Sequence, residues 1–88
     1  MNKNRNILLQ NLIFLRENFA SGSITIEECQ KNLSAFIYLS DIDEQEKLAK
    51  KYDNELEFII FTMNFPRQMH AILKALDEII NVIQRSIN

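Results

Sequence analysis

Leu56-Glu57-Phe58-Ile59-Ile60-Phe61-Thr62-Met63, followed at once by Asn64-Phe65-Pro66, is the stretch that decides the fold. A helix formed by its first eight residues has one charge and is apolar on every side, so other helices or a partner must cover it. Pro66 cannot continue a helix, because it lacks the N–H group, but it fits the first turn of a new one. The region Tyr52–Ile83 therefore predicts two helices joined by a hinge.

Apolar residues at three- and four-residue spacing predict that both sides of the hinge are helical. Beyond Pro66 this spacing is followed by Met69, Ile72, Leu73, Leu76, Ile80 and Ile83. Near the start of the chain it is followed by Leu8, Leu12, Leu15 and Phe19, with Leu9, Ile13 and Phe14 widening the apolar face. Gly22 is suited to end this first helix, because it adopts the left-handed conformation without steric cost.

Two sequence patterns predict where the middle helices begin. Thr25 and Glu28 form a capping box, in which each side chain accepts a hydrogen bond from the other residue's backbone, and Asp41 and Glu44 repeat the pattern. The expected buried residues are Cys29, Leu33, Phe36 and Ile37 in the second helix, and Leu48, Ala49, Tyr52, Leu56, Ile59, Ile60 and Met63 in the third. We predict helices at about residues 4–19, 26–39, 42–63 and 66–85.

Length and composition predict an all-α protein. The 88 residues include one Gly and one Pro, too few for the turns of an all-β fold, and 47% of them are hydrophobic. We expect a single domain, residues 1–88, folded as a small antiparallel bundle of about four helices in up-down-up-down order. Because so small a chain buries only about 60% of its unfolded surface, a partner or a second copy would add stability.

The charge distribution limits the classes of partner. Residues 40–57 hold seven acidic side chains against three lysines, a net charge of −4, whereas the rest of the chain carries +2. Nucleic-acid binding needs a basic stripe, which is missing, and no apolar run approaches the roughly 20 residues of a membrane span. Gln10 and Asn11 interrupt the first apolar run, so we expect no signal peptide. The prediction is a cytoplasmic protein that binds neither nucleic acid nor membranes.

Few residues have side chains suited to catalysis or metal binding. Cys29 and His70 are the only cysteine and histidine, so the sequence offers no multi-histidine metal site and no disulfide. Cys29 lies on the core face of its helix, where a thiol is inert, and His70 flanks an apolar face, as a surface histidine does. We therefore expect no enzymatic activity, no catalytic residue, no cofactor and no metal.

The acidic residues of the third helix are the one functional candidate. At helical spacing, one face is shared by Asp43, Glu46, Lys50, Asp53 and Glu57. We interpret its four acidic residues, Asp43, Glu46, Asp53 and Glu57, as a docking patch for a basic protein partner. The alternative is a solvated face with intrahelical pairs, such as Glu46 with Lys50 and Asp43 with Lys47. Phe58, Phe61 and Phe65 would either anchor such a partner or, as the composition favours, pack in the core.

Two segments resemble bacterial toxin-immunity proteins of the contact-dependent inhibition and polymorphic toxin type. They are Gly22-Ser23-Ile24-Thr25-Ile26-Glu27-Glu28 and Tyr52-Asp53-Asn54-Glu55-Leu56-Glu57, in a small acidic helical chain that is similar over Leu12–Ile83. The resemblance implies tight binding to a toxin domain, often a nuclease with a basic cleft, which the acidic face would occlude.

The sequence thus predicts a non-enzymatic protein-binding inhibitor, most consistent with an immunity protein that neutralises a cognate, basic toxin domain. A phage-encoded inhibitor of a host defence enzyme would need the same surface chemistry. A different class is a self-associating structural or adaptor module, in which the apolar segment Leu56–Met63 is buried against a second copy in a homodimer.

Overall fold

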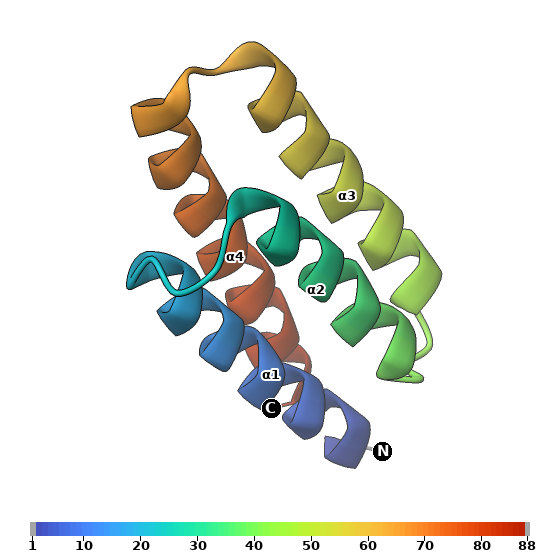
Figure 1. Cartoon of the computed structure of the whole chain (residues 1–88). Coiled ribbons are helices and arrows are strands. Elements are labelled where there is room, and N and C mark those ends of the chain that lie inside the picture. The colour runs from blue at the N-terminus through green and yellow to red at the C-terminus, as the bar shows by residue number, and fades with distance from the viewer. Residues whose placement is uncertain (1, 88) are drawn as a thin grey trace.

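Four helices make up the computed structural model, which describes residues 2–87; the two end residues of the predicted domain lie outside the described part. The helices are α1 (Asn2–Ala20), α2 (Ile26–Leu39), α3 (Gln45–Thr62) and α4 (Phe65–Ile87). α1 and α3 each pack against both α2 and α4, and consecutive helices run antiparallel, with the two ends of the chain at one end of the bundle (Figure 1). The predicted all-α antiparallel bundle is confirmed.

The core lies along the centre of the bundle and draws side chains from all four helices. Its helical members are Leu8, Leu12, Leu15, Phe19, Cys29, Leu33, Ile37, Ala49, Tyr52, Leu56, Ile59, Ile72, Ala75, Leu76, Ile79 and Ile83. The predicted face of α1 was too wide, because Phe14 is 65% exposed. None of the described helices combines the length and apolarity needed to cross a membrane.

The link between α1 and α2 has the local structure that its sequence predicts. Gly22 has a φ of 80° and ends α1, with the Ser23 N–H donating to the Asn18 carbonyl at 2.9 Å. At the start of α2, the Glu28 N–H donates to Thr25 Oγ1 at 3.1 Å, and the Thr25 N–H donates to Glu28 Oε1 at 2.9 Å. The predicted capping box at Thr25 is therefore confirmed.

The start of α3 differs from the prediction. The helix begins at Gln45 instead of residue 42, and neither Asp41 nor Glu44 caps it through its side chain. The reason is the burial of Ile42, which is only 5% exposed. To bring Ile42 into the core, the chain turns at Asp41, whose φ is 55° and which therefore cannot serve as an extended N-cap.

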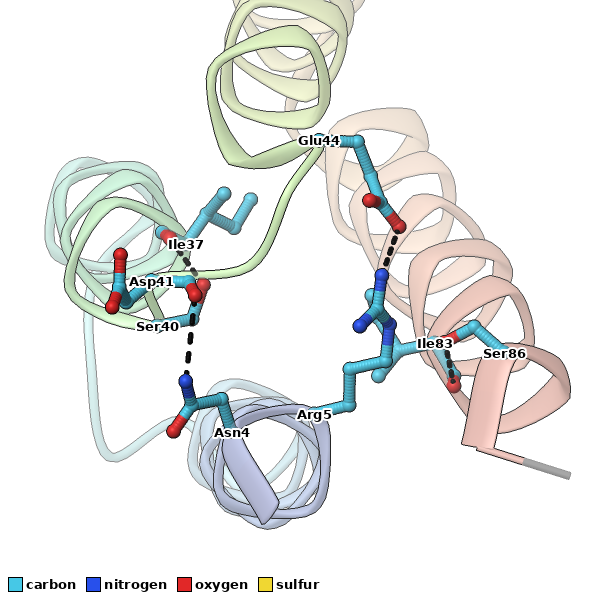
Figure 2. Close-up of polar contacts among 8 residues, drawn as sticks. All are labelled: Asn4, Arg5, Ile37, Ser40, Asp41, Glu44, Ile83 and Ser86. Atoms are coloured by element: carbon cyan, nitrogen blue, oxygen red, sulfur yellow. Dashed lines mark hydrogen bonds and ion pairs between the residues drawn. The ribbon is translucent and has the colours of Figure 1, made fainter. Parts of the chain in front are cut away.

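Glu44 instead forms an ion pair with α1 at one end of the bundle. Arg5 Nη2 of α1 donates to Glu44 Oε1 at 2.7 Å, and the side-chain amide of Asn4 donates to the Asp41 carbonyl at 3.4 Å (Figure 2). The hydrogen bond from Arg5 lowers the pKa of Glu44. These two contacts hold the link between α2 and α3 against the first turn of α1.

One glutamine of α4 forms hydrogen bonds across the hinge to the end of α3. Gln68 Nε2 donates to the carbonyls of Ile60, at 3.0 Å, and Met63, at 2.8 Å. Carbonyls in the last turn of a helix have no partner within that helix, so Gln68 satisfies groups that α3 leaves open. Pro66 lies in the first turn of α4, as predicted.

Replacing Gln68 with Ala should lower the free energy of unfolding by about 1–3 kcal/mol, because two partly buried carbonyls lose their donor. Urea denaturation of the variant measures this loss. Gln84→Ala is the matched control, since Gln84 is exposed on the same helix and no described residue bonds to its side chain. Equal stabilities of the two variants would contradict the role given to Gln68.

Candidate protein-docking surfaces

The structure brings three of the four predicted partner-binding residues onto one edge of α3. Glu46 and Glu57 are exposed, and Asp53 lies between them, half-buried. Asp43 is exposed but lies in the turn before α3, because the helix starts at Gln45. The grouping of Asp43 with the other three on one helical face is therefore wrong.

Asp53 is engaged within the bundle. Its Oδ1 accepts a hydrogen bond from Gln30 Nε2 at 3.2 Å and another from Ser34 Oγ at 3.4 Å, both from α2. These contacts show that this edge of α3 faces α2, and that Asp53 helps to hold the two helices together. Glu46 and Glu57 then remain as the carboxylates of this edge that point into solvent.

Two exposed aromatic side chains flank these carboxylates. Tyr38, one turn beyond Ser34 on α2, is 51% exposed, and Phe61, one turn beyond Glu57 on α3, is 82% exposed. Because α2 and α3 run antiparallel with the same rise per residue, Tyr38 lies nearly level with Glu46. We call Glu46, Asp53 and Glu57 with these two aromatic residues the acidic seam.

The alternative interpretation of the acidic residues is a solvated face with intrahelical ion pairs, such as Glu46–Lys50 and Asp43–Lys47. Among the described residues, the ion pairs are Arg5–Glu44, Arg16–Asp77 and Lys51–Glu78, so neither of these two intrahelical pairs forms. Glu46 and Glu57 therefore form no ion pair within the described part of the chain, although Lys47 and Lys50 line the same surface hollow as Glu46. A solvated face needs no such pair, so both interpretations of the acidic residues stay open.

The expectation that three phenylalanines pack in the core is wrong. Phe58 is 63% exposed, Phe61 82% and Phe65 65%. The core around them is filled instead by Leu56 and Ile59 from α3, which are 0% and 4% exposed. A helix that looked apolar on all sides thus buries one side and exposes phenylalanine on the other.

A groove of about 700 Å³ runs between α3 and α4. It is lined by Glu55, Phe58, Ile59 and Met63 of α3 and by Pro66, Arg67, His70, Ala71, Lys74, Ala75 and Glu78 of α4. Ala71 and Ala75 lie one turn apart, and their small side chains leave room that a larger residue would fill. We call this feature the α3–α4 groove.

The α3–α4 groove is lined by two carboxylates, Glu55 and Glu78, with Lys74 one turn before Glu78. Glu78 Oε1 accepts a hydrogen bond from the hydroxyl of Tyr52 at 3.4 Å and lies 3.8 Å from the Nζ of Lys51. Burial, and then the negative charge of Glu78, raise the pKa of Glu55, although Lys51 acts in the opposite direction. The negative charge of Glu78 thus disfavours ionisation of Glu55.

The structure places Cys29 and His70 in different surroundings. Cys29 is 0% exposed, and its burial raises the pKa of the thiol to about 12, so it stays protonated and unreactive. His70 is exposed at the rim of the α3–α4 groove. The core position predicted for Cys29 and the surface position predicted for His70 are both confirmed. Among residues 2–87, no group of three or more potential ligands is arranged to hold a metal ion.

Comparison of the chain with protein-family models, curated proteins and solved structures finds no match in any of the three. The resemblance to toxin-immunity proteins therefore stays a prediction, and the argument for function depends on the surfaces of the bundle.

Two features of these surfaces were missed in the sequence, although both leave a pattern there. Gln30, Ser34 and Tyr38 repeat every fourth residue on α2, which is the polar edge that meets Asp53. Ala71 and Ala75 have the same spacing on α4, where they hollow out the groove. Neither spacing predicts a contact or a groove until the helix that packs beside it is known.

Replacing Glu55 with Gln should raise stability at neutral pH but leave it unchanged in acid. Because folding raises the pKa of Glu55, the folded protein favours the protonated carboxyl over the carboxylate. The stabilisation by Glu55 is therefore fully present below the unfolded-state pKa and is lost as the pH rises through the folded-state pKa. The amide never ionises, so the gain over the parent protein should disappear below the ordinary pKa of 4.5.

Urea denaturation over a range of pH measures this difference. Glu57→Gln, at an exposed position on the same helix, serves as the control and should change stability little at any pH. A stability gain for Glu55→Gln that is equal in acid and at neutral pH would refute the proposed repulsion.

Proposed function

We propose that the chain is a non-enzymatic protein-binding inhibitor whose partner docks on the acidic seam. The observation that carries the proposal is the placing of exposed Tyr38 and Phe61 beside the unpaired carboxylates of Glu46 and Glu57. Tyrosine and other aromatic residues supply most of the binding energy in many protein interfaces, whereas complementary charge raises the rate of encounter. The acidic seam provides exposed aromatic side chains and negative charge to a basic partner.

The same surface chemistry suits an immunity protein. A toxin domain that acts on nucleic acid needs a basic cleft to hold phosphates, and an acidic edge with aromatic anchors competes for that cleft. The partner proposed is therefore a basic toxin domain, with no cofactor or nucleic acid involved. This narrower assignment also relies on the sequence resemblance, and it predicts that binding weakens as ionic strength rises.

A charge reversal on the seam tests this proposal. With the tagged protein used to capture its partner from a lysate of the source organism, Glu57→Lys should raise the dissociation constant by about tenfold, or about 1.4 kcal/mol. Phe61→Ala should also weaken binding, because an exposed aromatic anchor is lost. Calorimetry with the purified partner measures both effects.

Two matched controls lie on α1, away from the seam. Glu17→Lys reverses an exposed charge, and Phe14→Ala removes a side chain that is 65% exposed, so both should leave the affinity unchanged. Capture of no basic protein, or equal loss of affinity in seam and control variants, would contradict the proposed function.

A further inference from the structure

A second hollow, of about 470 Å³, lies at the end of the bundle that carries the hinge, between the α1–α2 link and the first turns of α4. Phe65 and Met69, one turn apart on α4, face the link, where Ile24 lies. Ile24 and Met69 are half-buried, whereas 65% of Phe65 is exposed, and the buried Phe19 forms the floor. We call this feature the hinge-end hollow.

Glu27 supplies the charge of the hinge-end hollow. Among the described residues that line it, Glu27 alone is charged. Its side chain is exposed in the first turn of α2, where the capping box of Thr25 and Glu28 fixes the backbone. Lys31, one turn further along α2, does not pair with it, since the ion pairs of the described residues involve neither side chain. An unpaired carboxylate therefore lies at the rim of an apolar hollow.

The combination of apolar walls, a carboxylate and an exposed aromatic ring fits an arginine side chain. The aliphatic stem of arginine packs on apolar surface while its charged head stays near water. The planar guanidinium can donate two parallel hydrogen bonds to one carboxylate, and it stacks on aromatic rings. A lysine ammonium is a strongly hydrated point charge that makes neither contact as well. Glu27 and Phe65 together therefore favour arginine.

The hinge-end hollow adjoins the acidic seam. Glu27 lies two turns before Ser34 on α2, on the edge whose side chains bond to Asp53. Because α2 and α3 run antiparallel with the same rise per residue, Glu27 lies level with Glu57, one turn from Phe61. A partner that docks on the seam and extends over the start of α2 therefore reaches the hollow.

We propose that the hinge-end hollow binds an arginine side chain of the basic partner. The guanidinium bonds to Glu27 and stacks on Phe65, and the stem packs on Ile24 and Met69. This inference rests on the proposed function, because it assigns one anchor of the same partner. Arginine is among the residues that supply most of the binding energy in protein interfaces. The seam then attracts a basic surface, and the hollow selects arginine on it.

Acetyl-arginine amide probes the hollow without the partner. In an NMR titration it should shift the methyl signal of Met69 and the ring signals of Phe65. Acetyl-citrulline amide has nearly the same shape but no charge, and it should bind at least about tenfold more weakly. Glu27→Gln should weaken binding of the arginine probe by a similar factor. The control Glu17→Gln changes an exposed glutamate of α1 and should have no effect.

The partner captured from the source organism links the hollow to the seam. Phe65→Ala and Glu27→Gln should each raise its dissociation constant by about tenfold. Phe14→Ala is the matched control, because Phe14 on α1 has the same exposed fraction, 65%. Urea denaturation checks that the variants stay folded, since the dipole of α2 also favours a carboxylate at Glu27.

Equal binding of the arginine and citrulline probes would overturn the arginine site. So would an unchanged partner affinity of Glu27→Gln and Phe65→Ala where Glu57→Lys weakens binding, and the proposed function would then stand without the hollow. Capture of no basic partner would contradict the proposed function and this inference with it, even where the probe binds.

Discussion

The contact of Gln68 with the last carbonyls of α3 is the constraint on which the functional surfaces depend. It lets the chain reverse within Met63 and Asn64, so that α4 returns along α3 at once. The short reversal fixes which residues of the two helices face each other, and it sets Ala71 and Ala75 opposite the side of α3 that carries Phe58. The α3–α4 groove follows from this register.

α3 is consequently the helix that contributes to both the acidic seam and the α3–α4 groove. Its buried stripe, centred on Tyr52 and Leu56, anchors it in the core. On the side toward α2 it carries the acidic seam, and on the side toward α4 it carries one wall of the groove. Phe61 lies on its outer surface and is almost fully exposed. A small bundle that buries only one stripe of α3 thus leaves residues on both of its flanks exposed.

The fold could be predicted from the sequence where local interactions decide it. The capping box at Thr25 and the hinge at Pro66 are local, and both are confirmed. The start of α3 is not local, because the burial of Ile42 against other helices overrides the capping pattern before it. Apolar composition likewise did not reveal that Phe58 would be exposed. Nor does helical spacing show that Asp53 bonds to α2.

The central claim is that the chain works by protein binding through its acidic seam. Native mass spectrometry of the complex isolated from the source organism with the tagged chain tests it most directly. The account predicts an assembly that holds the chain together with a basic protein partner, and Glu57→Lys should reduce the amount of that assembly. Recovery of the chain without a basic partner would contradict it.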